Sequence, residues 1–254
     1  MKDLGSASSI GELLEAAKDA ETAFQEMPWF RGHVSASWNL IPSAHRRHPV
    51  LETQFAQHFR LRAPSISQRC PAHQDTAAWL PLMRHYGLPT RLLDWSESVL
   101  VAAYFAIDVD LGCDHAIWVL SPGALNETSI GGFIPFLTDE RVKPLVSDAF
   151  GATIAHTPPA CLATLAPRID QRMAAQLGNY TIHGTRDPLE NHEQSSTFVG
   201  RIIIPSGARS NIRRELSLAG VRTSALFPDL ESLAREISDL RAIDKDGNEI
   251  EFDG

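Results

Sequence analysis

Hydrophobic positions recur along the chain with two different spacings, which predict a mixture of helices and strands. Ser9 and Glu12 have the spacing of a capping box at the start of a helix near the N-terminus. Apolar residues at helical spacing predict further helices over 53–62, 76–86, 99–107, 169–177 and 212–218. Short apolar runs predict strands at 29–34, 115–120 and 201–205.

Proline and glycine mark the ends of several of these elements. Gly87 stands where a helix commonly ends in a left-handed residue, and Pro89 prevents the helix from continuing. Pro228 suits the first position of a last helix, which would turn Leu230, Leu233 and Ile237 inward. The chain over 123–160 gives no clear assignment, and 185–197 reads as a polar loop.

Strands and helices follow one another without regular alternation, which favours an α+β fold over a doubly wound sheet. We therefore expect a central mixed or antiparallel sheet flanked by helices. Without a Pro- or Ser-rich linker to divide the chain, a single domain is expected over 1–254, with a core at about 24–240 and a short tail at 241–254.

The composition predicts a cytoplasmic protein. Hydrophobic residues make up 43% of the chain, but no run reaches the roughly 18 apolar residues of a membrane span. The N-terminus lacks the basic region and apolar stretch of a signal peptide. The three cysteines are far apart, which argues against a disulfide framework.

The net charge of −8 conceals a basic stretch. Positions 31 to 91 contain eight arginines and two acids, Glu52 and Asp75. The net charge of this stretch is therefore +6, and that of the remaining residues is −14. Those arginines are Arg31, Arg46, Arg47, Arg60, Arg62, Arg69, Arg84 and Arg91. Because the planar guanidinium suits phosphate and carboxylate, an anionic ligand is expected. The alternative is that these arginines form ion pairs with acids elsewhere in the fold.

Familiar catalytic signatures are absent from the sequence, including a Walker loop, GxGxxG, HExxH and GxSxG. His45 and His48 lie three residues apart, but no thiol or carboxylate stands beside them to complete a metal site. We therefore expect chemistry without a metal.

The tract HYGLPTRLLDW, 85–95, concentrates polar residues between two apolar helical segments. Its candidates for cofactor binding are His85, Tyr86, Thr90, Arg91 and Trp95. A guanidinium at position 91 would bind phosphate, and a ring at position 86 or 95 would stack on a base or a nicotinamide.

Each of these residues also has a structural interpretation. Asp94 and Glu97 have capping-box spacing, so Asp94 would cap the second helix, whose N-terminus would attract an anion. His85 would cover the end of the first helix, and Arg91 would simply pair with Asp94.

The sequence resembles the FRG domain family, named for the triplet that stands here as Phe30, Arg31 and Gly32. MRHYGLPTRLLDWSESVLVAAYFA, 83–106, resembles the most characteristic block of the family. PRIDQRMAAQLGNYTIHG, 167–184, resembles a third block and adds Gln176 to the cofactor-binding candidates. RELSLAGV and LFPDLESLAREI resemble its ending, so that the likeness extends from about 29 to 237.

The order of these blocks also resembles, more distantly, that of ADP-ribosyltransferases. The resemblance implies that Arg31 and Gly32 hold NAD, that the segment 90–106 follows as the second element, and that a carboxylate comes late in the chain. Asp229 and Glu231 are the best late acids, followed by Glu190 and Glu193. The Glu-x-Glu of the ADP-ribosyltransferases, or an equivalent glutamate, has no clear counterpart here. Asp229 also has a structural interpretation, because a negative charge is favourable in the first turn of a helix.

Two main functions follow from the resemblance and the residues. The first is an NAD-using transferase or glycohydrolase, in which Arg31 binds the pyrophosphate and Asp94, Asp229 or Glu231 stabilises a cationic ribosyl transition state. The second is a non-catalytic module that binds a nucleotide, a nucleic-acid end or a partner protein. Either would suit a toxin or phage-defence setting. A further alternative is a phosphodiester-cleaving enzyme that uses His33 or His85 as a general base. The structural interpretation of His33 is a strand residue that simply faces solvent. The transferase hypothesis requires Arg31, Thr90, Asp94 and one late acid to meet in one cleft.

Overall fold

The computed structural model describes residues 1–254 except 153–158, 166–170, 239–241, 244–248 and 251–254. The described strands form one seven-stranded sheet, in the order β1-β7-β4-β2-β3-β6-β5, and a separate pair, β8 and β9. β1 is parallel to β7, and the other neighbouring strands of the large sheet are antiparallel. The expected α+β fold with a central mixed sheet is confirmed. The strands are β1 Lys2–Ser6, β2 Trp29–His33, β3 Leu92–Ser96, β4 His115–Leu120, β5 Cys161–Thr164, β6 Gly178–His183, β7 Val199–Ile204, β8 Ala242–Ile243 and β9 Glu249–Ile250.

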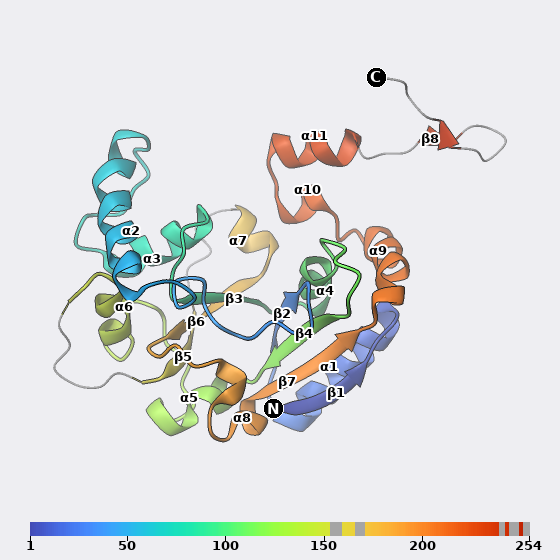
Figure 1. Cartoon of the computed structure of the whole chain (residues 1–254), viewed down its shortest axis with the longest axis horizontal. Helices are drawn as coiled ribbons and strands as arrows, with labels where there is room; N and C mark the ends of the chain where they lie inside the picture. The colour runs from blue at the N-terminus through green and yellow to red at the C-terminus, as the bar shows by residue number, and fades with distance from the viewer. Residues whose placement is uncertain (153–158, 166–170, 239–241, 244–248, 251–254) are drawn as a thin grey trace.

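Helices flank this sheet, as Figure 1 shows. The α-helices are α1 Ile10–Phe24, α2 Pro49–Arg62, α3 Thr76–His85, α4 Val99–Ala106, α5 Pro122–Ile130, α6 Lys143–Ala149, α7 Gln171–Ala175, α8 Ser195–Phe198, α9 Arg209–Leu218, α10 Thr223–Leu226 and α11 Leu230–Ser238. Three short 3₁₀ turns are η1 Ala63–Ser65, η2 Leu189–Asn191 and η3 Ser206–Ala208. The start predicted for α7, at position 169, lies outside the described residues.

Alternation along the strands divides the core between the two faces of the sheet. On one face Phe30 packs in a cluster with α1, α4 and α9, while Leu92 packs in a second cluster with α2, α3 and α6. On the opposite face Trp29, Trp95 and Trp118 pack with residues of α5 and α8. The tryptophans are thus committed to the core that faces away from α3 and α4.

The two central strands, β2 and β3, are only partly paired. β2 pairs with β4 over five residues and β3 pairs with β6 over five, but β2 and β3 meet at a single pair, Phe30 and Ser96. Beyond that pair no ladder joins them, so the sheet consists of two well-paired halves that meet at one point. Side chains therefore occupy the opening between the strands.

Gly32 lets α4 lie directly on β2. A Cβ atom added at Gly32 would overlap the carbonyl oxygen of Ala102 and would lie 2.5 Å from the nitrogen of Ala106. Both are backbone atoms, which cannot rotate away as a side chain would. This close backbone approach fixes α4 against the strand that carries Arg31.

Asp94 does not cap a helix, which corrects the prediction from its spacing to Glu97. It lies in the middle of β3, opposite Tyr180 of β6. The helix begins later, at Val99, and Ser98 caps it by accepting a hydrogen bond from the nitrogen of Val101. The tract 85–95 therefore leads from a helix into a strand, and its end is not a helix N-terminus.

The last helix also differs from the prediction. Leu230, Leu233 and Ile237 of α11 are 83%, 41% and 56% exposed, so they do not face the core. Pro228 precedes the cap instead of opening the helix, because the Asp229 carboxylate accepts the hydrogen bond from the nitrogen of Ser232 at 2.7 Å. The unassigned stretch 123–160 contains most of α5 and all of α6, and the polar loop 185–197 contains η2 and most of α8.

Candidate functional site

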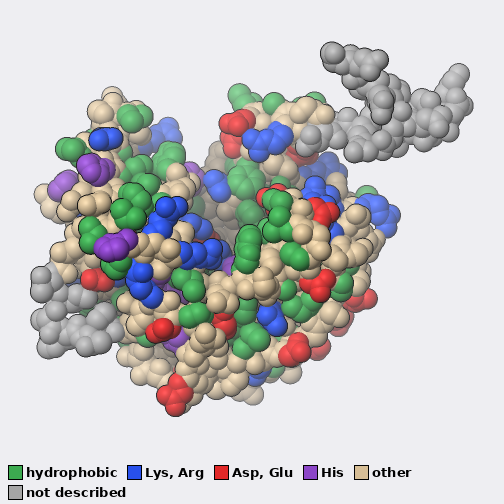
Figure 2. Space-filling view, in the orientation of Figure 1, with side chains coloured by type: hydrophobic (Ala, Val, Ile, Leu, Met, Phe, Trp, Pro, Cys, Tyr) green, Lys and Arg blue, Asp and Glu red, His purple; other side chains and the backbone are tan. Residues whose placement is uncertain are grey.

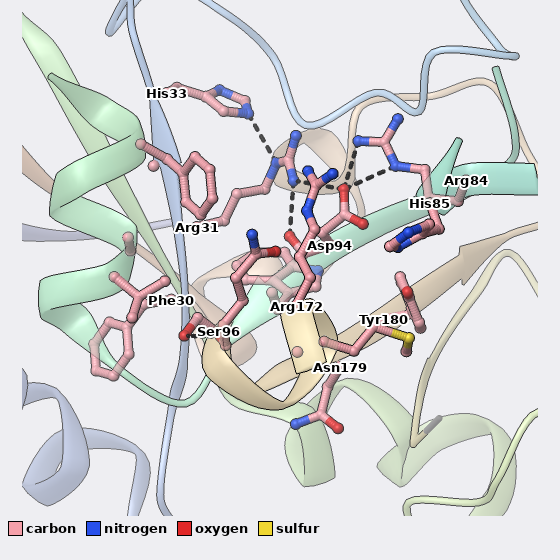
Figure 3. Close-up of a pocket in the computed structure, with 18 of the residues that line it drawn as sticks. Phe30, Arg31, His33, Arg84, His85, Asp94, Ser96, Arg172, Asn179 and Tyr180 are labelled. Carbon is pink, nitrogen blue, oxygen red and sulfur yellow. Dashed lines mark hydrogen bonds and ion pairs between the residues drawn. The ribbon is translucent and has the colours of Figure 1, made fainter. Parts of the chain in front are cut away.

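A cavity of about 650 Å³ lies where β2 and β3 diverge, and we call it the central cavity. β2 and α4 form one wall, and β3, β6, α7 and the end of α3 form the other (Figure 3). Its polar and aromatic lining residues include Arg31, His33, Trp38, Arg46, Arg84, His85, Tyr86, Asp94, Ser96, Phe105, Arg172, Gln176, Asn179 and Tyr180.

An ion-pair cluster centred on Asp94 forms the floor of this cavity. Arg84 donates to Oδ2 of Asp94 from Nε at 2.8 Å and from Nη2 at 2.5 Å. Arg31 donates from Nη1 to the backbone oxygen of Asp94 at 2.7 Å and lies 3.6 Å from Oδ2. Figure 3 shows both guanidinium groups pointing toward this aspartate. A single carboxylate thus orients two arginines that come from different elements.

The ion pairs determine the charge states in the cluster. Burial by itself would raise the pKa of Asp94, but Arg84 and then Arg31 outweigh it and hold that pKa below its usual value. Burial lowers the pKa of Arg31 to about 10, although the charge of Asp94 opposes this shift. At neutral pH all three groups are therefore charged, and Asp94 does not serve as a proton acceptor.

His33 is a buried partner of Arg31 and does not face solvent, which corrects the simpler reading of this residue. Nε of Arg31 donates to Nε2 of His33 at 3.1 Å, and Nδ1 of the ring lies 3.2 Å from the oxygen of Trp38. Burial, and then the charge of Arg31, lower the pKa of His33 to about 3, so the ring is neutral. Arg31 donates to Nε2, and the indole nitrogen of Trp118 lies 3.1 Å from Nδ1, so the buried neutral imidazole holds the guanidinium in place.

Positive charge dominates the central cavity. Its described lining contains Arg31, Arg46, Arg84 and Arg172 but only one carboxylate, Asp94, which gives four minus one, or +3. Figure 2 shows Lys and Arg side chains gathered beside the hollow on this face of the molecule. A concave, positively charged surface attracts anions.

Aromatic rings stand around the same cavity. Tyr86 is 66% exposed and Trp38 is 44% exposed, so both rings are available at the rim. Phe105 from α4 lies within the lining and contacts Phe227 edge to face. Arg172 lies over the ring of Phe227 at 4.5 Å, which joins the wall formed by α7 to the segment after α10.

Seven of the eleven residues predicted to form a site line the central cavity. They are Arg31, Gly32, His85, Tyr86, Asp94, Trp95 and Gln176. Trp95 does so without offering its ring, which is buried on the opposite face of the sheet and donates to Thr181 at 3.0 Å. The side-chain amide of Gln176 donates to the oxygen of Leu226 at 3.2 Å and so contributes to the wall.

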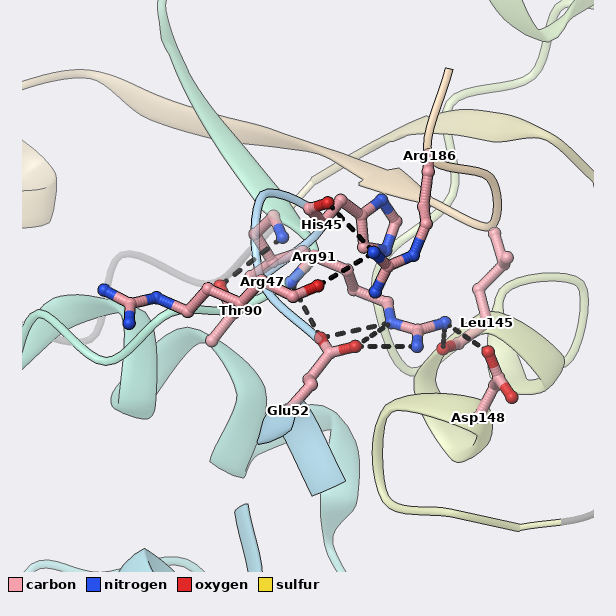
Figure 4. Close-up of polar contacts among 9 residues, drawn as sticks. His45, Arg47, Glu52, Thr90, Arg91, Leu145, Asp148 and Arg186 are labelled. Atoms are coloured by element: carbon pink, nitrogen blue, oxygen red, sulfur yellow. Dashed lines mark hydrogen bonds and ion pairs between the residues drawn. The ribbon is translucent and has the colours of Figure 1, made fainter. Parts of the chain in front are cut away.

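Thr90 and Arg91 lie outside the cavity, in a separate buried network (Figure 4). The side chain of Arg91 donates to both carboxylate oxygens of Glu52, to Asp148 at 2.7 Å and to the oxygen of Leu145. Thr90 is fully buried, and its backbone oxygen accepts from the nitrogen of Ala44. The predicted pairing of Arg91 with Asp94 is wrong, and its guanidinium is engaged in holding α2 and α6 to β3.

The late acids also lie away from the cavity. Asp229 caps α11 through Ser232, which confirms the structural role expected at the first turn. Glu231 forms an exposed ion pair with Arg235 at 3.1 Å. Of the four groups required to converge for the transferase hypothesis, only Arg31 and Asp94 do so.

The sequence did not single out several residues that line the cavity. Arg84 belongs to the characteristic block 83–106 but precedes the tract 85–95 by one residue, and both Arg84 and Arg46 belong to the basic stretch. Arg172, Asn179 and Tyr180 come from a segment about 80 residues further along. The local excess of arginine was the available signal for the first two.

In the described part of the chain, no three His, Cys, Asp or Glu side chains form a group that could hold a metal ion. None of the described helices combines the length and the apolar character needed to cross a membrane.

Comparisons with known proteins agree with the resemblance in the sequence. The model of the FRG domain matches residues 26–112, a span that contains β2, α2, α3, β3 and α4. No curated protein and no solved structure matched the chain. The matched span contains Arg31, Arg84 and Asp94, the ion-pair cluster of the central cavity. Residues 26–112 of this chain thus match the FRG domain, and this span supplies the floor of the cavity.

Proposed function

We propose that the central cavity binds an anionic ligand of the nucleotide class, which combines phosphate groups with an aromatic ring. The observation that supports this most is the convergence of four arginines and one carboxylate in a single concave site. A volume of about 650 Å³ falls within the range typical of small-molecule sites. The geometry favours binding over catalysis. Asp94 and His33 could act as bases, but both are engaged in contacts with arginines.

The phosphate part of the ligand would bind at the arginines. Arg31 and Arg84 are held by Asp94 in fixed orientations, so little side-chain entropy remains to be lost when an anion arrives. Arg46 is exposed. Among the hydrogen bonds between described residues, its side chain donates one, from Nε to the oxygen of Ile41. Arg46 belongs to the cavity lining, and its terminal nitrogens would bind phosphate oxygens directly.

The ring part of the ligand would stack on the aromatic rim. Tyr86 and Trp38 are exposed and lie within the lining of the same cavity as the arginines. Stacking on such rings contributes about 1–3 kcal/mol per base. The combination of guanidinium and aromatic groups favours a nucleotide over inorganic phosphate alone.

Calorimetric titration of the purified protein tests this function with three probes: pyrophosphate, adenosine and ADP. ADP is expected to bind more tightly than either part alone. Arg84→Gln should weaken ADP binding at least about tenfold, because a charge-assisted hydrogen bond contributes about 1.5–3 kcal/mol. Arg214→Gln, on exposed α9, is the matched control and should bind as the unmodified chain does. Absence of heat with all three probes, or equal affinity in both variants, would exclude the proposal.

A second candidate is the NAD-using transferase or glycohydrolase implied by the distant resemblance. One observation favours it: Arg31 on the early strand and Asp94 stand together in a cavity. Two observations count against it. The late acids and Thr90 lie elsewhere, and Asp94 is ion-paired with two arginines.

NAD turnover separates the two candidates. The transferase hypothesis predicts that the protein releases nicotinamide from NAD and that Asp94→Asn abolishes the release. The binding hypothesis predicts that NAD binds and is recovered intact after prolonged incubation, as measured by chromatography. The proposed toxin or phage-defence setting would require growth arrest or phage resistance when the gene is expressed, with loss of the effect in Arg84→Gln.

A further inference from the structure

Three exposed arginines extend the positive charge of the central cavity over the neighbouring surface, and we call them the outer arginines. Arg46 belongs to the cavity lining and precedes Arg47 in the loop between β2 and α2. Arg186, from the loop after β6, donates from Nη1 to the oxygen of Arg47 at 2.8 Å and to the oxygen of His45 at 3.3 Å. Figure 4 shows this contact between the two loops.

The outer arginines differ from Arg91 in their surroundings. Among the described residues, no carboxylate forms an ion pair with Arg46, Arg47 or Arg186. Arg91, by contrast, is neutralised by Glu52 within the fold. Removing that buried pair from the stretch 31–91 leaves seven arginines and one acid, Asp75. The stretch thus keeps an excess of positive charge in a chain whose net charge is −8.

The exposed rings line the same cavity as its arginines. Trp38 lies in the same loop as Arg46, and Tyr86 follows the helix that carries Arg84. A positive surface with exposed rings is the combination by which proteins bind single strands of nucleic acid, because backbone phosphates meet the arginines and bases stack on the rings. A membrane surface is flat and would not enter the cavity, and a peptide would not need the rings.

We propose that the ligand of the central cavity is one nucleotide of a single-stranded nucleic acid, whose neighbouring phosphates lie on the outer arginines. This inference rests on the proposed function, because it places the nucleotide in the same cavity. It adds that the affinity of the site increases with the length of the strand, and that Arg47 and Arg186 act only on the part of the strand outside the cavity.

Fluorescence anisotropy with labelled 12-nucleotide RNA and DNA, together with ADP competition, tests the inference. The strand is expected to bind at least tenfold more tightly than ADP. The double variant Arg47→Gln/Arg186→Gln should bind the strand at least tenfold more weakly while its affinity for ADP changes less than twofold. The slope of log affinity against log salt should fall by about 1.4, because each contact with a single-stranded phosphate contributes about 0.7. Arg84→Gln should weaken the binding of both ligands.

The outcomes distinguish this inference from the function on which it rests. If ADP binds and the strand binds no better, or if the double variant binds the strand normally, the inference is overturned and the nucleotide cavity stands. If an acidic phosphopeptide displaces the strand more effectively than unlabelled strand does, the partner is a protein and the inference is again overturned. If neither ADP nor the strand binds, both fail together. Arg214→Gln/Arg235→Gln, two substitutions of the same kind on α9 and α11, controls for the loss of net charge.

Discussion

Arg31 in β2 and Asp94 in β3 join the two halves of the sheet beyond the last pair of their strands. Nη1 of Arg31 donates to the backbone oxygen of Asp94 at 2.7 Å, and the strands themselves pair only at Phe30 and Ser96. A side chain therefore bridges two strands that have no ladder there. The same guanidinium lines the central cavity, so one residue both supports the fold and contributes positive charge to the site.

Asp94 acts as a built-in counter-ion, and its neutralisation should strengthen anion binding. In Asp94→Asn the arginines lose a competing carboxylate that lies 3.6 Å from Arg31 and 2.5 Å from Arg84. A carboxylate about 4 Å from a bound anion repels it by about 1 kcal/mol even in water, so the affinity for pyrophosphate should rise about fivefold. Asp110→Asn, which removes the exposed partner of Arg209, is the control and should leave affinity unchanged. Calorimetry checks both, and weaker binding by folded Asp94→Asn would contradict the prediction.

Gly32 should tolerate no side chain, because the Cβ of Gly32→Ala would overlap backbone atoms of α4. Accommodating it requires α4 to move away from β2, at an expected cost of at least about 3 kcal/mol in the free energy of unfolding. Gly207→Ala is a matched control, since a Cβ there meets no atom within 4 Å. Urea denaturation of the two variants measures the difference, and equal stability would show that α4 is not fixed by this contact.

Local patterns predicted the elements whose signals are complete within a few residues. The helix ending at Gly87, the buried helix from Val99 and the strand that carries Arg31 were all predicted at their observed places. β3 was missed because Asp94 and Glu97 imitate a capping box, whereas the conformation at Asp94 is determined by pairing with Tyr180, 86 residues away. Spacing along the chain contains no information about that partner.

The polar strand β6 shows a second limit. Tyr180 and Ile182 alternate there with Asn179, Thr181 and His183, but this polar set is also buried, so the alternation does not mark a solvent-facing side. Its burial follows from neighbours contributed by β3 and β5. The same reasoning applies to the site, where the sequence located Arg31 and Asp94 but not Arg172, which a distant helix places beside them.

Arg91 should contribute to stability and not to ligand binding. Glu52 accepts from the backbone nitrogen and the side chain of Arg91, and both side chains are about 7% exposed. Glu52→Gln leaves a buried guanidinium partly unpaired and should lower the free energy of unfolding by about 3–5 kcal/mol. Its affinity for ADP should stay within twofold, because this network lies outside the cavity.

Glu231→Gln, which breaks an exposed pair, is the control and should lower the free energy of unfolding by less than about 1 kcal/mol. A large loss of ADP affinity in folded Glu52→Gln would show that the two regions are coupled.

His33 should make the protein less stable as the pH falls below about 6.5. Burial and the charge of Arg31 lower its native pKa from 6.5 to about 3. Between these values the unfolded chain takes up a proton that the native imidazole refuses, so the free energy of unfolding decreases with falling pH by up to about 1.4 kcal/mol per unit. Buried His183, whose pKa is also lowered, contributes in the same direction.

His33→Gln isolates the contribution of this one histidine, since the amide oxygen still accepts from Arg31 but does not titrate. Urea denaturation at intervals from pH 7 to pH 4.5 should give a shallower decline for His33→Gln than for the unmodified chain, while Arg214→Gln retains the full slope. This pH range lies above the pH at which Asp94 takes up a proton, because the pKa of Asp94 is lowered. Protonation of Asp94 therefore does not contribute to the decline. Parallel profiles for His33→Gln and the unmodified chain would mean that His33 is protonated in the native state, and that Arg31 lacks the neutral acceptor on which its orientation depends.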